Sequence, residues 1–359
     1  MPPERTRYRA FPIPAVVIMF APKILAIGAT AASATNLFVS DYGGAVTSFA
    51  LTASNGTYAL NDTFSTDECA PSPSWLTIDA NRGLLFCLNE GLTTPNGSLS
   101  SFTINGDGSL THVKNETTIS GPVSGVIYGA AAGQRALALA HYSGSSVTSY
   151  LLNGAGKFAL NQELTYTLDE PGVVPDRQDA PHEHEAITDP TGKYIVVPDL
   201  GADLVRIFSW DDETLKLEEL DPLEATPGTG PRHAVFWNPY GVACEECTTY
   251  FYLVGELDST ITAFSVEYLP NGGGLNFTQV FNSTTYGLLN LPEGNAPAEI
   301  QVTVTSCASK DPSAAELMTF AARQPFHRHL QPQQHFIRPA TARWLDPGVR
   351  LALYLQAAR

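Results

Sequence analysis

Two short segments of the sequence combine residues that could carry out acid–base chemistry on a small molecule. Residues 181–185 read Pro-His-Glu-His-Glu, so His182 and His184 would lie on one side of an extended strand. Paired imidazoles suit either general acid–base catalysis or metal binding. A metal ion would need a third and a fourth ligand from elsewhere in the chain, so the pattern favours proton transfer and predicts no metal and no other cofactor. A hydrogen-bonded structural histidine is the alternative, for His182 in particular.

The second segment covers residues 227–233 and reads Pro-Gly-Thr-Gly-Pro-Arg-His. Its Gly-Pro turn would hold Arg232 rigidly at the start of the strand that follows. A guanidinium there suits a carboxylate, a phosphate or a developing oxyanion. The alternative is a salt bridge to an acid such as Glu256. The two interpretations overlap, because a catalytic arginine often needs such a partner.

An internal repeat indicates the elements that would hold these residues. Five segments share a β-rich run, a polar residue, a short turn and a second strand that ends in an aromatic residue, at intervals of about 50 residues. They span residues 37–49, 85–102, 136–150, 195–208 and 252–264, and further short strands precede three of them at residues 75–79, 185–189 and 233–237. Such a period filled with short strands is typical of a β-propeller, in which each repeat forms one four-stranded blade.

The direction of the strands predicts where ionisable residues gather. The first and second strands of a blade run antiparallel, so the start of the first and the end of the second lie on one face. The strand starts are Ser74, Ser124, His184, Arg232 with His233, and Glu299, and the strand ends are Asp41, Glu90, His141, Asp199 and Glu256. We therefore expect ionisable side chains around one mouth of the propeller. Turn preference is the alternative explanation, because Asp and Asn are common at strand ends.

The composition supports a folded, β-rich protein and excludes one class of partner. Of the 359 residues, 43% are hydrophobic, which is enough to bury a core and excludes wholesale disorder. Only 16% are charged, and the formal net charge is −16. A surface this acidic repels phosphate backbones, so we expect no nucleic-acid partner.

Residues 1–34 have the pattern of a signal peptide. A basic start and an apolar run lead to a small-residue cleavage site at Ala32 to Ala34, and Met19 offers a cleaner start for a compact signal peptide. The apolar run is too short and too interrupted to span a bilayer. Six Asn-x-Ser/Thr sequons add support for a secreted, extracellular glycoprotein, at Asn55, Asn61, Asn96, Asn115, Asn276 and Asn282.

The cysteines fit the same compartment. In an exported protein, Cys69 with Cys87 and Cys244 with Cys247 are plausible disulfides. The count of five, which includes Cys307, leaves at least one cysteine unpaired or paired between chains. For the Cys-x-x-Cys pair, a structural disulfide within the loop is favoured over a zinc or redox role, because a single pair lies in a loop before a strand.

Several stretches in combination resemble one known family, the seven-bladed β-propeller lactonases, which include 6-phosphogluconolactonase and the fungal 3-carboxymuconate cyclases. The resemblance covers residues 36–304 and rests on residues 181–184 (Pro-His-Glu-His), 189–193 (Asp-Pro-Thr-Gly-Lys), 198–203 (Pro-Asp-Leu-Gly-Ala-Asp), 230–233 (Gly-Pro-Arg-His) and 254–257 (Val-Gly-Glu-Leu). It implies an all-β propeller with a His, an Arg and a Glu at the channel mouth and no required metal. These roles fall on His184, Arg232 and Glu256.

The resemblance also implies that the protein opens a lactone ring. His184 would be the general base on water or the proton carrier of a cyclase, Arg232 would bind a substrate carboxylate or the oxyanion, and Glu256 would orient Arg232 or shuttle a proton. The residues predicted to contact substrate around them are His182, His233, Asp199, Glu90 and His141. We expect a monomer that hydrolyses a small sugar or aromatic-derived lactone. The alternatives are a carboxymuconate-type cycloisomerase and a non-catalytic propeller that binds carbohydrate or protein.

The repeat stops before a ring of seven is complete. Residues 35–304 form the predicted propeller domain with about five recognisable blades, whereas residues 305–359 hold six Arg and three His and lack the strand–turn–strand rhythm. The arginine turn that the family has in the next blade is missing. We interpret this tail as the product of a frame error or a retained intron, which leaves the ring incomplete. A helical capping tail over residues 314–322 is the alternative, and a native tail would favour an inactive or ligand-binding protein.

Overall fold

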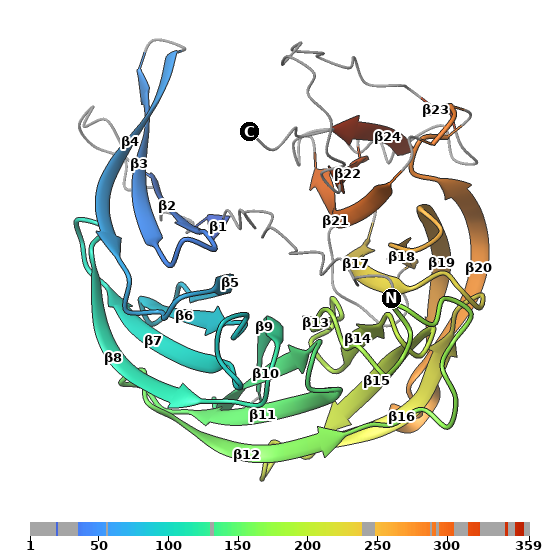
Figure 1. Cartoon of the computed structure of the whole chain (residues 1–359), viewed down its shortest axis with the longest axis horizontal. Helices are drawn as coiled ribbons and strands as arrows, with labels where there is room; N and C mark the ends of the chain where they lie inside the picture. The colour runs from blue at the N-terminus through green and yellow to red at the C-terminus, as the bar shows by residue number, and fades with distance from the viewer. Residues whose placement is uncertain are drawn as a thin grey trace, which may run out of the picture.

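The described strands form six four-stranded sheets that follow one another around a central axis as an arc (Figure 1). The computed structural model describes residues 35–54, 57–129, 133–238, 248–287, 289–291 and 294–304, and outside them the strand segments 19–20, 315–323, 342–343 and 349–354. Each sheet is one blade, and blades 1 to 6 are numbered in chain order. The prediction of an all-β propeller is confirmed. No helix in this part of the chain is long and apolar enough to cross a bilayer.

Blades 1 to 5 are antiparallel sheets whose four strands pair in chain order. Blade 1 consists of β1 (Met19–Phe20), β2 (Thr35–Ser40), β3 (Val46–Ser54) and β4 (Thr57–Thr66), and blade 2 of β5 (Pro73–Asp79), β6 (Leu84–Asn89), β7 (Ser98–Ile104) and β8 (Leu110–Thr117). Blade 3 consists of β9 (Pro122–Gly129), β10 (Arg135–His141), β11 (Ser146–Leu152) and β12 (Phe158–Thr165). Blade 4 consists of β13 (Ile187–Thr188), β14 (Ile195–Asp199), β15 (Leu204–Trp210) and β16 (Leu217–Glu224), and blade 5 of β17 (Pro231–Trp237), β18 (Thr249–Gly255), β19 (Thr260–Tyr268) and β20 (Leu275–Thr284). The five repeats of the sequence are the second and third strands of these blades, and the three preceding strands correspond to β5, β13 and β17.

The sixth sheet departs from this order. It consists of β21 (Asn295–Val304), β22 (Ala315–Arg323), β24 (Val349–Tyr354) and β23 (Ala342–Arg343), and β22 pairs with β24 in parallel. The helix considered for residues 314–322 is therefore not formed, because most of that segment is the strand β22. A parallel pair needs a crossover connection, unlike the hairpins of the other five blades. That the tail is not native sequence stays a prediction.

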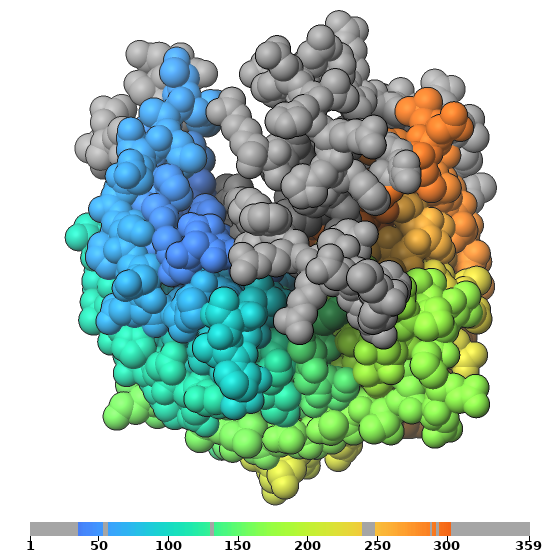
Figure 2. Space-filling model, in the orientation of Figure 1, coloured from blue at the N-terminus to red at the C-terminus, as the bar shows by residue number. Residues whose placement is uncertain are grey.

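Apolar residues fill the interfaces between neighbouring blades, which explains the continuous apolar runs of the second strands. In β6, Leu84 and Phe86 pack in a cluster shared with blade 3, whereas Leu85 and Cys87 pack in a cluster shared with blade 1. Successive side chains of a strand point to opposite faces, so a strand covered on both faces must be apolar throughout. Similar clusters join blades 3 and 4, 4 and 5, and 5 and 6. Figure 2 shows the blades side by side along the arc.

The first strands of four blades carry a β-bulge at the same end. Two residues there oppose one residue of the second strand, and the residues at the bulges are Ser74 in β5, Val123 in β9, Arg232 with His233 in β17, and Ala298 in β21. In blade 4, His184 lies at the corresponding place, next to an isolated bridge between Glu183 and Asp199. Bulges bend a strand and re-aim a side chain. This end of the propeller is the mouth predicted from the sequence.

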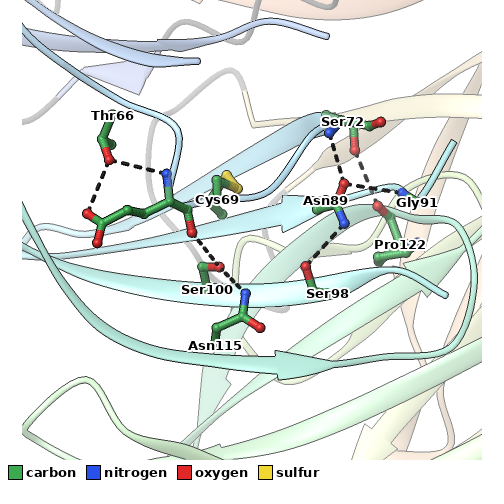
Figure 3. The surroundings of a disulfide bond; sticks show 12 residues. Thr66, Cys69, Ser72, Asn89, Gly91, Ser98, Ser100, Asn115 and Pro122 are labelled. Atoms are coloured by element: carbon green, nitrogen blue, oxygen red, sulfur yellow. Dashed lines mark hydrogen bonds between the residues drawn. A yellow bond between two sulfur atoms is a disulfide. The ribbon is translucent and has the colours of Figure 1, made fainter. Parts of the chain in front are cut away.

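One of the two predicted disulfides lies within the described residues. Cys69, in the connection between blades 1 and 2, is bonded to Cys87 of β6, and both residues are fully buried (Figure 3). The same figure shows Asn89 at the end of β6, whose Oδ1 accepts a hydrogen bond of 2.9 Å from the backbone N–H of Ser72. The chain entering blade 2 is thus tied to β6 at two points. Cys244, Cys247 and Cys307 lie outside the described residues.

Candidate active site

The last residues of the second strands β6, β10 and β14 are Asn89, His141 and Asp199, which are buried and support the strand ends. His141, which ends β10, is fully buried, and its Nε2 lies 2.8 Å from Oγ1 of Thr148. Burial lowers the pKa of His141 to about 4. Asp199, which ends β14, accepts the backbone N–H of His182 at 2.8 Å through Oδ1 and Nη2 of Arg206 at 2.7 Å through Oδ2. These contacts are internal to the blades.

The residue that follows the strand end is the one that reaches the mouth. Glu90 follows β6, Tyr142 follows β10 and Glu256 follows β18. Their side chains contact a residue of another blade or Arg177, which lies in the connection between blades 3 and 4. The prediction that placed His141 and Asp199 among the substrate contacts is therefore corrected. It was one residue out of register, and a shift of one residue turns a side chain to the opposite side of a strand.

Arg232 and Glu256 form the ion pair that the sequence suggested. Nε of Arg232 lies 2.7 Å from Oε2 of Glu256, and Nη1 of Arg232 also donates to the carbonyl oxygen of Ala298 in blade 6. The other carboxylate oxygen of Glu256 lies 2.7 Å from Nη2 of Arg177. Burial alone would raise the pKa of Glu256, but the two guanidiniums hold it below its usual value. Glu256 is therefore a fixed anion that orients arginines, which favours this role over proton shuttling.

A capped turn fixes the position of Arg232. The two carboxylate oxygens of Asp203 accept the backbone N–H groups of Gly228 and Gly230, at 2.6 and 2.8 Å. Gly230 has φ of +61°, and a Cβ there would overlap the side chain of Leu257. Only glycine fits this position. Asp203 belongs to blade 4, so the Gly-Pro turn before Arg232 is held by the neighbouring blade.

His184 has the environment of a neutral base. It is buried, its Nδ1 has no hydrogen-bond partner among the described residues, and its ring packs against those of Tyr142 and His233 with centroids 5.4 and 5.1 Å apart. Burial, followed by the charges of Arg232 and His233, holds the pKa of His184 well below 6.5. A neutral imidazole with an unused nitrogen can accept a proton at neutral pH.

His182 has a supporting position. Its ring stacks on that of Tyr142 with centroids 4.3 Å apart, and Nδ1 lies 2.8 Å from the carbonyl oxygen of Tyr142. Nε2 lies 3.1 Å from Oδ1 of Asp179. Both ring nitrogens are engaged with the protein. The structure thus agrees with the structural alternative for His182, which fixes Tyr142 at the mouth.

His233 joins three blades beneath Arg232. Its Nδ1 lies 2.9 Å from Oε2 of Glu299 in blade 6 and 3.8 Å from Oε1 of Glu185 in blade 4. Burial lowers the pKa of His233, but the two carboxylates raise it overall. These ligand atoms lie within 4.8 Å of one another, so the three residues could hold a metal ion. Glu185 also accepts a hydrogen bond of 2.6 Å from the backbone N–H of Ala234. The three residues therefore also connect blades 4, 5 and 6.

Glu90 and Tyr42 occupy the part of the mouth formed by blades 1 and 2. The hydroxyl of Tyr42 donates to Oε2 of Glu90 at 2.8 Å. Burial raises the pKa of Glu90, and the charge of Arg232 acts in the opposite direction on both Tyr42 and Glu90. This acid therefore lies within electrostatic range of Arg232 without pairing with it.

Sequence analysis missed Arg177 and Tyr142. Arg177 lies in the long connection between β12 and β13, which has no strand pattern to place it. Nη2 of Arg177 lies 3.2 Å from the hydroxyl of Tyr142 in addition to its contact with Glu256. Tyr142 follows His141 directly, so the correct register of β10 would have identified it.

Comparison with known proteins agrees with this fold. The family described as "Lactonase, 7-bladed beta-propeller" matches residues 29–307, which is well over half of the chain. The chain therefore belongs to the seven-bladed β-propeller lactonases. Its described residues account for six sheets.

Relatives within and around this family include named lactonases. The chain is 34% identical over 231 residues to a protein of Arthroderma benhamiae named "Probable 6-phosphogluconolactonase", covering 64% of this chain and 55% of that protein. It is 24% identical over 213 residues to a "6-phosphogluconolactonase" of Formosa agariphila, covering 58% of this chain and 56% of that protein. The chain thus spans about half the length of these curated relatives. The solved periplasmic gluconolactonase PpgL of Pseudomonas aeruginosa shares the fold, with a TM-score of 0.59, 22% identity, and coverage of 80% of this chain and 77% of that one.

Proposed function

We propose that the protein is a hydrolase that opens a small sugar or aromatic-derived lactone at the propeller mouth. The observation that carries the proposal is the position of His184, which is buried, has no hydrogen-bond partner for Nδ1 among the described residues, and lies within range of the charge of Arg232. Nη2 of Arg232 also has no hydrogen bond to a described residue. Family membership supports lactone hydrolysis as the class of reaction.

In this reaction His184 would transfer the proton and Arg232 would stabilise the negative charge. His184 takes a proton from water as the water oxygen attacks the lactone carbonyl carbon. The carbonyl electron pair moves onto oxygen, and Arg232 stabilises the oxyanion. When the carbonyl reforms, the ring C–O bond breaks, and the departing oxygen takes the proton back from the imidazolium of His184. The product is an open-chain hydroxy acid.

Kinetics on two variants tests this assignment. We expect His184→Ala to lower kcat/KM for a lactone such as D-glucono-1,5-lactone by about 10²–10⁴-fold, and Arg232→Ala by about 10²–10³-fold. Arg82→Gln is the control, because Arg82 lies at the opposite end of β5 beside Asp79. Wild-type turnover in both variants would refute the site. Binding of the sugar acid by a wild-type protein that opens no lactone would favour the non-catalytic alternative.

We further propose that the protein is a secreted glycoprotein. The fully buried disulfide Cys69–Cys87 supports an oxidising compartment. The five sequon asparagines within the described residues are all exposed, namely Asn61, Asn96, Asn115, Asn276 and Asn282, whereas Asn55 lies outside them. Expression in a eukaryotic secretory host should give a medium-borne protein whose mass falls on treatment with a peptide N-glycosidase. Retention inside the cell without glycan would contradict the proposal.

A further inference from the structure

Glu185, His233 and Glu299 form a cluster of ionisable residues that the proposed reaction does not use. They come from three consecutive blades: Glu185 lies two residues before β13, and His233 and Glu299 lie at the bulges of β17 and β21. One nitrogen or oxygen atom from each residue lies within 4.8 Å of the other two. Glu185 and His233 are 4% and 6% exposed, and the side chain of Glu299 is 29% exposed. The cluster is therefore enclosed by protein and reaches solvent at Glu299.

Each carboxylate of the cluster has one oxygen held by the protein and the other directed at His233. Oε2 of Glu185 accepts the backbone N–H of Ala234 at 2.6 Å, and its Oε1 lies 3.8 Å from Nδ1 of His233. Oε1 of Glu299 accepts a hydrogen bond from Nε2 of Gln301 at 3.1 Å, and its Oε2 lies 2.9 Å from the same Nδ1. Hydrogen bonds of this kind orient the ligands of metal sites.

Oε1 of Glu185 is a buried oxygen without a hydrogen bond to a described residue. Nδ1 of His233 carries at most one proton, and its hydrogen bond is to Oε2 of Glu299. A buried carboxylate oxygen that lacks a donor destabilises the folded protein. A cation bound between the three residues would remove this cost.

The balance of charge in the cluster also favours a cation. Two carboxylates face one imidazole, so the ionised group is net negative even when His233 is protonated. The guanidinium of the preceding residue, Arg232, is already paired with Glu256 at 2.7 Å. A divalent cation would supply the positive charge that the cluster lacks.

The spacing of the atoms fits tetrahedral coordination. Zn²⁺ binds imidazole nitrogen and carboxylate oxygen at about 2.0–2.2 Å, so two ligand atoms of a tetrahedral ion lie about 3.3–3.6 Å apart. The two distances from Nδ1 of His233, 2.9 Å to Glu299 and 3.8 Å to Glu185, lie on either side of this range. Shifts of less than about 0.5 Å bring both distances into the tetrahedral range.

We propose that Glu185, His233 and Glu299 bind a divalent metal ion, and that Zn²⁺ is the ion that best matches these ligands. Zinc accepts imidazole nitrogen and carboxylate oxygen, and a water molecule completes the fourth position. The ion ties blades 4, 5 and 6 together. His182 and His184, whose sequence pattern favours proton transfer, are not among its ligands. The site does not depend on the proposed lactone hydrolysis.

Calorimetric titration of the full chain with Zn²⁺ tests the site after treatment with a chelator and dialysis. Wild type is compared with Cys244→Ser/Cys247→Ser, which removes the Cys-x-x-Cys pair, another pattern that can bind zinc. We expect both to bind one equivalent with a micromolar or tighter Kd. Glu185→Gln and Glu299→Gln should each weaken this binding at least tenfold. Glu163→Gln is the matched control, because Glu163 is an exposed acid on β12 of blade 3, and it should change Kd less than twofold.

Thermal unfolding checks that the variants fold and gives a second measure of binding. Glutamine keeps a carbonyl oxygen for the donors that hold Glu185 and Glu299, so we expect both variants to fold without metal. Zn²⁺ should raise the Tm of the wild type and of Glu163→Gln and leave that of Glu299→Gln unchanged, because a ligand stabilises only a protein that binds it. If Glu185→Gln does not fold, Glu299→Gln still tests the site, since that side chain is partly exposed.

Three results would overturn the proposal. The first is absence of zinc binding to the wild type, and the second is an unchanged affinity in Glu299→Gln. The third is loss of binding in Cys244→Ser/Cys247→Ser, which would place the ion at the cysteine pair. All three are binding results, so they are independent of whether the protein opens a lactone.

Discussion

Glu90 and Glu256 occupy equivalent places in different blades, yet their carboxyl groups have opposite pKa shifts. Each is the first residue after the second strand of its blade, and each reaches the mouth. Glu256 lies between Arg177 and Arg232, and its pKa is lowered. Glu90 accepts a hydrogen bond from Tyr42, and burial raises its pKa. The mouth therefore has an ion-paired half in blades 3 to 5 and a half in blades 1 and 2 that favours a protonated acid.

The difference shows that the propeller repeat determines where a residue lies, while its partners determine its charge. Burial raises the pKa of a carboxyl group, and a nearby cation or hydrogen bonds donated to the carboxylate lower it. Two acids with divergent pKa values at one site can take different chemical roles. The ion-paired half has the unused donors and the neutral base, so we assign the reaction to that half.

Of the two acids, Glu256 should have the larger effect on activity when its charge is removed. Glu256→Gln leaves two guanidiniums without the anion that orients them, so we expect kcat/KM to fall on the order of 10³-fold. The measurement is steady-state hydrolysis by Glu256→Gln and Glu90→Gln side by side. A loss of similar size in Glu90→Gln would show that both halves of the mouth take part equally in catalysis.

The disulfide should stabilise the half of the mouth that holds Glu90. Cys87 lies two residues before Asn89, and the bond to Cys69 closes a loop with a sequence separation of 18. Replacement of both cysteines by alanine should lower the free energy of unfolding by about 3 kcal/mol. Denaturant titration of the variant and of the wild type with and without reductant measures this. If reductant destabilises the variant as much as the wild type, another cysteine pair carries the effect.

The sequence predicted the blades more accurately than the site. The continuous apolar runs identified five second strands, because a strand buried on both faces has few other interpretations. The functional residues at the strand ends were harder to predict. His141 and Asp199 are polar residues of types common in active sites, but in the structure they support the ends of their strands. Arg177 could not be predicted, because its place depends on Gln178 and on contacts between blades 3, 4 and 5. His184, Arg232 and Glu256 were expected at one mouth, and the structure brings Arg232 and Glu256 into contact there and His184 within range of the charge of Arg232.

The pH dependence of activity should come from the ion-paired half alone. The pKa of His184 is well below 6.5, so the imidazole stays an active base throughout the neutral range. We expect kcat/KM to stay constant within about twofold between pH 8 and 6.5 and to fall about tenfold per pH unit only at lower pH. A pH–rate profile of the wild type measures this, with Glu90→Gln as the control that should have the same profile. If the fall in kcat/KM has its midpoint at or above pH 6.5, His184 is not desolvated, or another group is the base.

Replacement of Glu90 should have the smallest effect, a change in the free energy of unfolding. The sign of this change distinguishes the two halves of the mouth. The folded state prefers the protonated form of Glu90, so this residue lowers stability as pH rises from the unfolded pKa of about 4.3 through the higher folded pKa. Glutamine resembles the protonated acid and has no such penalty. Glu90→Gln should therefore match the wild type in free energy of unfolding at pH 4 and equal or exceed it, by up to about 1 kcal/mol, at pH 8. Glu256→Gln should show the reverse, because the lowered pKa of Glu256 contributes stability above pH 4.3 that is lost as pH falls through its folded pKa. If Glu90→Gln is less stable than the wild type at pH 8 but not at pH 4, the Glu90 carboxylate is a stabilising anion like Glu256, and the contrast between the two halves of the mouth does not hold.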